Sequence, residues 1–206
     1  PTRAECDLSK SGAVTKFLEA IDFSNVVYLI NNAADQSVAE LKNAKPDEIS
    51  LMMQTNFNSI AEIYSFAARN PANLKSILNI SSIEAINARP GHVIYGASKA
   101  ALKLFTEGLR SELMGTNVGV TVAFPGAVAT NITANSGIAM PEVAADAKAF
   151  KQTAAPVAAK IMVDAIEKNR TRITVGKDAT MLDRISRLNP VFAANMIYKQ
   201  MKSLLG

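Results

Sequence analysis

Four short apolar runs, each rich in β-branched residues, constrain the fold of this chain more than any other feature. They cover residues 26–30, 77–80, 118–124 and 172–175. None of them alternates apolar with polar residues, which indicates strands buried on both faces of a parallel sheet. Apolar residues recur at helical spacing over residues 46–69, 95–114 and 156–169. This alternation predicts βαβ units in an open α/β sheet, with a ligand cleft beyond the carboxyl ends of the strands.

The composition indicates one soluble globular domain. The chain has 206 residues, of which 49% are hydrophobic and 19% charged, so it is long enough to bury one good-sized core. No apolar run reaches the roughly 18 residues that a membrane-spanning helix needs. Cys6 is the single cysteine, which excludes an internal disulfide and favours a reducing compartment such as the cytoplasm. We predict no metal site.

The positive charge is concentrated in the C-terminal segment. Residues 160–206 hold nine Lys plus Arg against four Asp plus Glu, whereas the rest of the chain holds 13 against 14. Such a segment can attract a membrane surface or an acidic partner, but solvated helix faces explain it more simply. Aromatic and basic residues do not interleave as they do in nucleic-acid-binding segments, so no nucleic-acid partner is expected.

Two further segments are interpreted from their patterns. Residues 181–206 are expected to form two amphipathic helices that divide near Pro190, packed on the body of the protein rather than on a membrane. Residues 130–150 are rich in small side chains, which fits either a mobile flap over the site or an ordinary surface connection.

A tyrosine and a lysine form the first candidate site. Tyr95 and Lys99 are four residues apart and therefore share one face of the predicted helix 95–114. A neighbouring ammonium group favours the ionised form of a phenol, so the two side chains can form an acid–base unit. A Tyr-x-x-x-Lys pair also arises by chance, and the pair alone does not establish the site.

Polar residues that follow two of the strands form the other candidates. Ser81 and Ser82 follow the run 77–80, where a hydroxyl can hydrogen-bond a carbonyl oxygen, although a serine there is often a turn or helix cap. The segment Asn31 to Ala34 follows the run 26–30, where its small residues permit close approach of a flat ligand. A polar turn explains that segment equally well.

Together these features resemble the signature of the short-chain dehydrogenase/reductase family. The matching residues, in chain order, are Asp7 and Leu8, Asn31 to Ala34, Asn56, Ser82, Tyr95, Lys99, and the segment from Pro125 to Thr130. The interval of thirteen residues between Ser82 and Tyr95 is the family's own, which selects Ser82 over Ser81. The resemblance implies a Rossmann-like, doubly wound parallel sheet. It also implies an NAD(P)-dependent oxidoreductase acting on a carbonyl compound or a secondary alcohol.

The resemblance assigns roles to these residues. Tyr95 would be the catalytic acid–base, Lys99 would lower its pKa and hold the nicotinamide ribose, and Ser82 would orient the substrate carbonyl. Asn56 would position a water that links Lys99 to a proton relay. The expected cofactor-binding residues are Asp7, Leu8, Asn32, Ala33, Ala34, Tyr95, Lys99, Pro125, Gly126, Val128 and Thr130. The implied cofactor is NAD or NADP, and the implied assembly is a cytoplasmic homodimer or homotetramer.

Two features depart from the family pattern. Ala34 replaces the usual glycine, and the glycine-rich turn that cradles the pyrophosphate is absent together with the first two strands. We therefore expect one partial domain over residues 1–206, in which residues 1–9 form the family's third strand, about 10 Å from the run 26–30. On this interpretation the sequence is a fragment of a longer reductase and binds cofactor poorly by itself. The alternative is a cofactor-deficient module for interaction or dimerisation.

Overall fold

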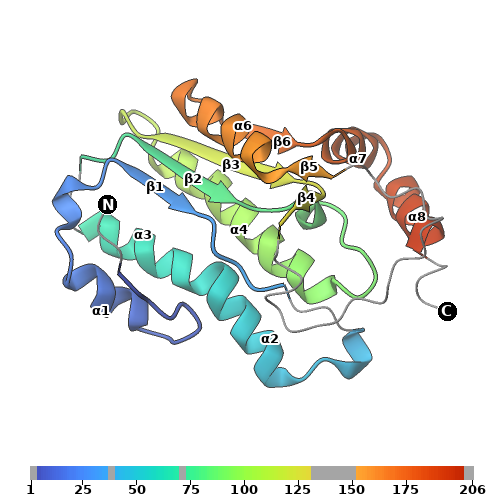
Figure 1. The fold of residues 1–206 in the computed structure, drawn as a ribbon, viewed down its shortest axis with the longest axis horizontal. Helices are drawn as coiled ribbons and strands as arrows, with labels where there is room; N and C mark the ends of the chain where they lie inside the picture. Colours follow the sequence, from blue (N-terminus) through green and yellow to red (C-terminus); the bar gives the residue numbers. More distant parts are fainter. Residues whose placement is uncertain (1–3, 37–39, 70–72, 131–151, 202–206) are drawn as a thin grey trace.

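A four-stranded parallel sheet forms the centre of the molecule (Figure 1). The computed structural model describes residues 4–36, 40–69, 73–130 and 152–201. The sheet consists of β1 (Tyr28–Asn31), β2 (Ser76–Ile80), β3 (Gly119–Pro125) and β6 (Arg172–Val175), in the order β1-β2-β3-β6. All neighbouring strands are parallel. The predicted α/β class is confirmed, and the four predicted strands are present with ends shifted by at most two residues.

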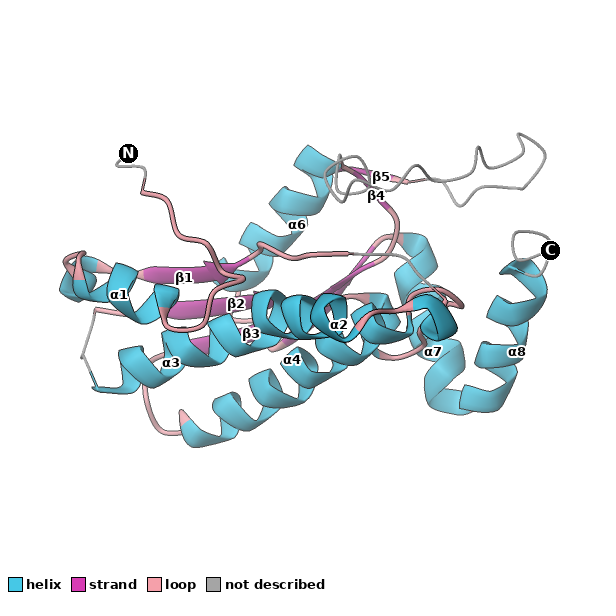
Figure 2. Cartoon of the chain, turned by 90° about the horizontal axis from the view of Figure 1, so that it is seen from below, coloured by secondary structure: helices cyan, strands magenta, loops and turns pink. Residues whose placement is uncertain are grey.

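Helices cover both faces of this sheet (Figures 1 and 2). On one face, α3 (Ser59–Arg69) and α4 (Val93–Glu112) pack over a buried cluster formed by Ile60, Tyr64, Ile77, Leu102 and Val120. On the other face, α6 (Ala155–Glu167) packs over a cluster that includes Leu78, Ala123, Ala158, Ile166 and Ile173. Ile77 and Leu78 belong to different clusters because successive side chains of a strand point to opposite faces. Burial on both faces explains why β2 and β3 lack polar alternation, whereas the same expectation is wrong for β1.

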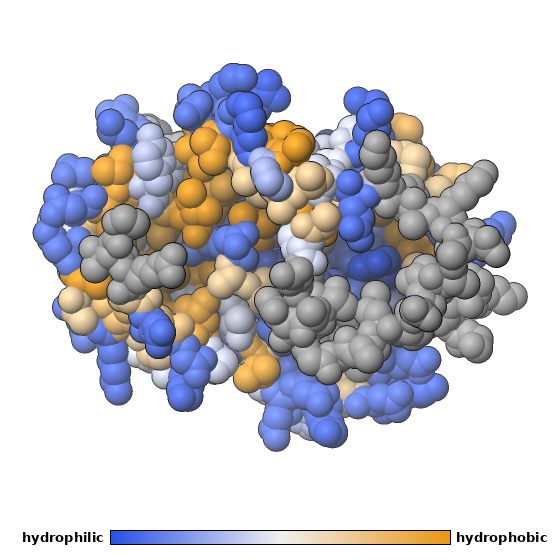
Figure 3. All heavy atoms as spheres, viewed as in Figure 1, coloured by the Kyte–Doolittle hydropathy of each residue, from blue (hydrophilic) through white to orange (hydrophobic). Residues whose placement is uncertain are grey.

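The face of β1 that lies opposite α3 and α4 is open to solvent. Leu29 packs against the cluster beneath α3 and α4, whereas Tyr28 and Ile30 are 54% and 49% exposed. The space-filling view shows apolar surface in this part of the molecule (Figure 3). Within the described ranges β1 has one neighbouring strand, β2, and therefore forms an edge of the sheet.

Small elements follow the carboxyl ends of β3 and β6. β4 (Val128–Ala129) pairs in parallel with β5 (Thr153–Ala154), and α7 (Lys177–Leu188) begins two residues after β6. α8 (Pro190–Met201) starts at the proline, which suits the first helical position because its missing N–H would be unpaired there in any case. The predicted division near Pro190 is confirmed, although the first helix begins at Lys177 rather than at residue 181. The predicted flap lies outside the described residues except for Thr130.

A π-helical turn interrupts the helix that was predicted over residues 46–69. α2 (Pro46–Met53) leads into the π-helical turn Gln54–Asn58, and α3 continues from Ser59. The wider turn carries an extra residue relative to α-helix, and such turns concentrate at functional sites. Three short 3₁₀ helices complete the described structure, at Phe23–Asn25, Leu41–Asn43 and Ile83–Ala85.

The predicted strand over residues 1–9 is wrong for the part that the structure describes. Asp7 opens a turn in which its carbonyl accepts a hydrogen bond from Lys10 N and its carboxylate accepts from Ser9 N and Oγ. None of the described strands lies beside residues 4–9, and an isolated strand leaves its backbone hydrogen-bonding groups unpaired. α1 (Ala13–Glu19), which was not predicted, follows this turn and packs against α3.

Candidate active site

The ends of the strands bring the predicted site segments to one edge of the sheet. The register pairs Asn31 with Asn79, Ile80 with Ala123, and Pro125 with Val175. The residues that directly follow the strands therefore lie along the same edge: Asn32 after β1, Ser81 and Ser82 after β2, Gly126 after β3 and Gly176 after β6. In open α/β sheets this carboxyl edge is where ligands bind.

Lys99 is the most deeply buried charged group of this edge. It lies on α4, is 2% exposed, and its Nζ donates a hydrogen bond to the carbonyl oxygen of Ile80 at 2.9 Å. Ser81 Oγ donates to the backbone carbonyl of Lys99 at 2.8 Å, which fastens α4 to the end of β2. Burial disfavours the charged ammonium and lowers the pKa of Lys99 to about 8.

Tyr95 lies one helical turn before Lys99 and is 7% exposed. The Lys99 Nζ atom is 5.8 Å from the centroid of its ring. Burial raises the pKa of Tyr95 to about 12, the negative charge of Glu84 acts in the same direction, and hydrogen bonding to Ser82 opposes both. The expected lowering of the Tyr95 pKa is therefore wrong for this structure, because burial of the phenol and the charge of Glu84 raise that pKa more than Ser82 and Arg89 lower it.

A buried charged cluster that was not predicted stands next to Tyr95. Glu84 accepts hydrogen bonds from Arg89 Nε at 2.9 Å and Arg89 Nη2 at 2.5 Å, and His92 Nδ1 lies 3.2 Å from its second oxygen. Burial raises the pKa of Glu84, but hydrogen bonding to His92 and the charge of Arg89 outweigh it and leave that pKa lowered. Ser82 Oγ accepts a hydrogen bond from Glu84 N at 3.2 Å. The predicted catalytic serine, two residues after the end of β2, therefore contacts this charged cluster directly.

Asn56 joins the loop after β1 to α4. Its Oδ1 accepts from Asp35 N at 2.8 Å, and its Nδ2 donates to Asp35 O at 2.8 Å and to Ser98 Oγ at 2.9 Å. Ser98 Oγ in turn donates to the carbonyl of Tyr95 at 2.8 Å. The hydrogen bonds of the Asn56 side chain thus hold two segments of the site together, and they do not include Lys99 among the described residues.

A second buried network, also missed, supports β1 and β2 beneath the site. Asn79 Oδ1 accepts from Asn31 Nδ2 at 2.7 Å and from Tyr64 Oη at 2.8 Å, and Asn79 Nδ2 donates to Thr106 Oγ1 at 2.9 Å. Burial raises the pKa of Tyr64, because the phenolate would be desolvated there. This second tyrosine is consequently a structural hydrogen-bond donor and not a rival acid–base.

The structure groups most, but not all, of the predicted cofactor-binding residues. Asn32, Ala33 and Ala34 follow β1 at the carboxyl edge, and Asn32 and Ala33 are exposed. Pro125 ends β3 and Gly126 follows it, while Val128 lies in β4 and Thr130 follows that strand. Asp7 and Leu8 instead lie beside α1, where Leu8 packs against the cluster of Val14, Leu18 and Phe23.

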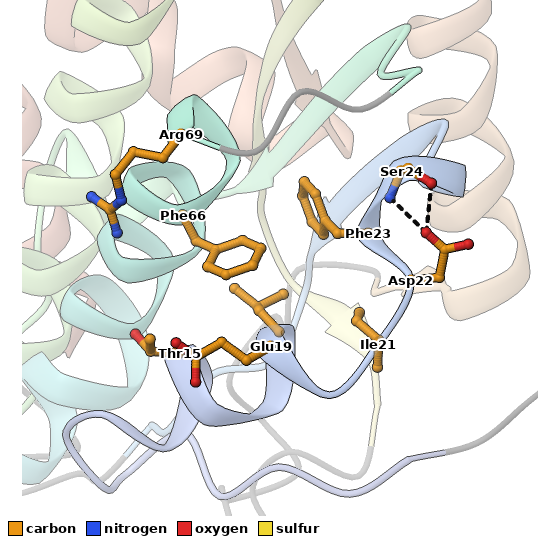
Figure 4. Close-up of a pocket in the computed structure, with 9 residues that line it drawn as sticks. Thr15, Glu19, Ile21, Asp22, Phe23, Ser24, Phe66 and Arg69 are labelled. Carbon is orange, nitrogen blue, oxygen red and sulfur yellow. Dashed lines mark hydrogen bonds between the residues drawn. The ribbon is translucent and has the colours of Figure 1, made fainter.

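A cavity of about 570 Å³ lies away from these residues, between α1, the 3₁₀ helix Phe23–Asn25 and α3. Phe23 and Phe66 point toward each other across it, with ring centroids 5.4 Å apart (Figure 4). Its lining contains no predicted site residue. Neither a helix able to cross a membrane nor a metal-binding group of three or more His, Cys, Asp or Glu occurs in the part of the chain that the structure describes.

A parallel sheet with helices on both of its faces, and with a buried tyrosine and lysine at its carboxyl edge, defines a Rossmann-like α/β protein. Comparison with known families agrees, since the family model described as short chain dehydrogenase matches residues 2–140. The chain belongs to the short-chain dehydrogenase family.

Curated relatives match part of their own length. An uncharacterized oxidoreductase of Staphylococcus saprophyticus is 33% identical over 135 residues, which are 62% of this chain and 54% of that protein. Carbonyl reductase family member 4 of Danio rerio is 32% identical over 132 residues, 63% of this chain and 56% of that protein. The chain thus spans about half the length of the curated relatives it matches.

Solved structures share the fold. A short chain dehydrogenase from Burkholderia cenocepacia in complex with NADP has a TM-score of 0.77 at 23% identity, over 94% of this chain and 76% of that one. A short chain dehydrogenase/reductase from Burkholderia phymatum in complex with NAD has a TM-score of 0.73 at 22% identity, over 91% of this chain and 75% of that one. At these identities the likeness supports the fold alone.

Proposed function

We propose that this chain carries the acid–base site of an NAD(P)-dependent oxidoreductase that acts on a small carbonyl compound or the corresponding alcohol. The observation that carries the proposal is the meeting of Ser82, Tyr95 and Lys99 at the carboxyl end of β2. Relatives and structural neighbours, among them a carbonyl reductase and complexes with NADP and NAD, support this class of reaction.

Lys99 has the donor chemistry that a ribose requires. A lysine ammonium has three N–H donors, and the hydrogen bonds of the structure use one of them, to Ile80 O. Because Lys99 is 2% exposed, its other N–H donors have little access to water. A polar ligand that accepts hydrogen bonds from these donors would therefore be stabilised there. The exposed backbone at Asn32 and Ala33 and the segment from Pro125 to Thr130 would hold the rest of the cofactor. When bound, the cofactor supplies the hydride to the carbonyl carbon or accepts it from the alcohol.

Tyr95 and Ser82 then act on the substrate oxygen. Ser82 Oγ donates a hydrogen bond to that oxygen, and Tyr95 Oη transfers its proton to it as the carbonyl becomes an alcohol. A phenol with a pKa of about 12 keeps its proton at neutral pH, which suits the reduction direction. Glu84 and Arg89 form an ion pair, and the charges of both side chains act on Tyr95.

The test measures oxidation of NADPH and NADH by the 206-residue chain over a panel of aldehydes and ketones. Tyr95→Phe is expected to lower turnover by about 10² to 10⁴-fold, because it removes the proton donor and keeps the ring. Tyr198→Phe is the matched control, since Tyr198 is 52% exposed on α8. Unchanged turnover in Tyr95→Phe overturns the role of Tyr95. Calorimetric titration of the wild-type chain tests the expected weak binding of NADPH and NADH, which micromolar affinity would refute. A stable oligomer that binds neither cofactor favours an interaction or dimerisation module instead.

The assembly and location of the protein also stay predictions. We propose a homodimer or homotetramer that packs α3 and α4 of neighbouring copies together, supported by Leu104 of α4, which is 69% exposed. Sedimentation velocity of the wild-type chain and of Leu104→Glu tests this, and a monomeric wild type overturns it. We also propose a cytoplasmic location, which the single cysteine supports.

A further inference from the structure

Asp178 connects the carboxyl ends of β3 and β6. It lies in the first turn of α7, immediately beyond β6, and its Oδ2 accepts a hydrogen bond from Ala127 N at 2.7 Å. Ala127 belongs to the turn after β3, 51 residues earlier in the chain. A charge-assisted hydrogen bond of this length is among the stronger ones that proteins form.

Two glycines make room for the Asp178 carboxylate. A Cβ atom on Gly126 would overlap Oδ2, and a Cβ atom on Gly176 would overlap Oδ1. Gly176 also has a φ of 104°, a conformation that residues with a Cβ atom rarely adopt. The φ angle of Gly126 does not require a glycine. The close approach of the Asp178 carboxylate therefore explains why a glycine is needed at position 126.

The same turn is held from two other directions. Gly126 N donates to Val175 O at 2.9 Å, and Ala127 O accepts from Thr153 N at 2.8 Å. The N–H of Ala127 donates to Asp178 Oδ2 and its carbonyl accepts from Thr153 N, so both backbone polar groups of Ala127 are hydrogen-bonded. These hydrogen bonds fix the direction in which the chain enters β4. Val128, the next residue, is one of the residues proposed to contact the cofactor.

We infer that Asp178 is a positioning residue, which holds the Gly126–Ala127 turn so that Val128 and Thr130 face the cofactor. The inference that Val128 and Thr130 face the cofactor rests on the proposed function. The inference that Asp178 fixes the Gly126–Ala127 turn does not. Asp178 acts through Ala127 and not on the substrate, so it is distinct from Ser82, Tyr95 and Lys99. A helix N-terminus favours an acidic residue in its first turn for electrostatic reasons alone. The experiment therefore has to distinguish this electrostatic role from the hydrogen bond between Asp178 and Ala127.

Amide hydrogen exchange at Ala127, followed by NMR, separates the two roles. Asp178→Ala removes the acceptor and is expected to speed exchange at Ala127 by about tenfold or more, the equivalent of one ordinary hydrogen bond. Asp178→Asn keeps an acceptor oxygen without the charge and is expected to retain most of the protection. Lys177→Ala, at an exposed neighbouring position, is the control and should leave Ala127 unchanged. Exchange in Asp178→Ala at the wild-type rate overturns the inference.

A double-mutant cycle gives a second reading if Asp178→Ala folds poorly. Gly126→Ala should destabilise the wild-type protein, because its methyl group meets the carboxylate, and should cost less in the Asp178→Ala background, where that group is gone. Equal costs in both backgrounds contradict the contact.

Cofactor titration by calorimetry then tests the functional part. Asp178→Ala is expected to weaken the Kd for NADPH or NADH by about tenfold, with Asp178→Asn close to wild type. Faster exchange at Ala127 with an unchanged Kd overturns the positioning role. If the wild-type chain binds neither cofactor, the proposed function fails, and the inference about Asp178 is decided by the exchange data and the cycle.

Discussion

Replacing Lys99 by Met tests how strongly the site shifts the titration of its ammonium group. Burial lowers the pKa of Lys99 from the ordinary 10.5 to about 8 in the folded chain, whereas in the unfolded chain the side chain is solvated. Between these two values the unfolded state binds more protons at Lys99 than the folded state does. The free energy of unfolding therefore rises with pH across this window, and the contribution of Lys99 is destabilising below it.

The size of the effect follows from the two pKa values. A difference of about 2.5 corresponds to about 3 kcal/mol of destabilisation at neutral pH, most of which disappears as the pH approaches 10. Lys99→Met keeps most of the length of the side chain and removes the charge. We expect the wild type to gain about 2 to 3 kcal/mol relative to this variant between pH 7 and pH 10.

Urea denaturation followed by circular dichroism at pH 7, 8, 9 and 10 measures this difference. Titration of Tyr95 and of the other groups affects both proteins, so the difference between wild type and Lys99→Met isolates the lysine. Lys177→Met, at an exposed lysine, is the control variant. If the difference between wild type and Lys99→Met stays constant from pH 7 to 10, burial does not shift this titration and the reasoning is refuted.

Two further predictions concern the support of the fold. Asn79→Ala removes three buried hydrogen bonds and should lower the free energy of unfolding, measured by urea denaturation, by about 3 kcal/mol. Asn58→Ala, at an exposed position, is its control. A loss of stability in Asn79→Ala as small as that in the control contradicts the network. For Asp183, burial raises the pKa, but hydrogen bonding from Arg172 outweighs it and leaves the pKa lowered. Wild-type stability should therefore fall as the pH drops through that pKa, and Asp183→Asn should flatten this acid dependence; parallel unfolding curves from pH 7 to 3 would argue against it.

The strands and the core of the site were predictable because their signals are local. A short β-branched run predicts a strand, and all four runs became strands, although one face of β1 is exposed. Ser82, Tyr95 and Lys99 lie within eighteen residues of one another, so their spacing alone describes a helix face that follows a strand. The predicted strand at residues 1–9 failed for the opposite reason, because a strand depends on a neighbour that its own residues do not specify.

The residues that were missed depend on contacts between distant segments. Asn79 meets Asn31 across the sheet, and Asp178 reaches Ala127 from 51 residues away. Glu84 follows a strand as an ordinary loop carboxylate, and only the folded turn brings Arg89 and His92 onto it. Polar residues with such partners look like solvated residues in a sequence, since hydropathy records burial tendency and not the identity of a partner.

The π-helical turn Gln54–Asn58 lets the long helical segment hold one residue more than a regular α-helix would between α2 and α3. Each residue of an α-helix advances its direction by about 100°, so a residue deleted between Ser59 and Tyr64 would rotate the rest of α3 by that angle. Tyr64 would then turn away from the strands beneath it. The wide turn can lose its extra residue and return to ordinary winding with Ile60 and Tyr64 still facing the sheet, so the turn is the place in this segment where a single-codon deletion rotates α3 least.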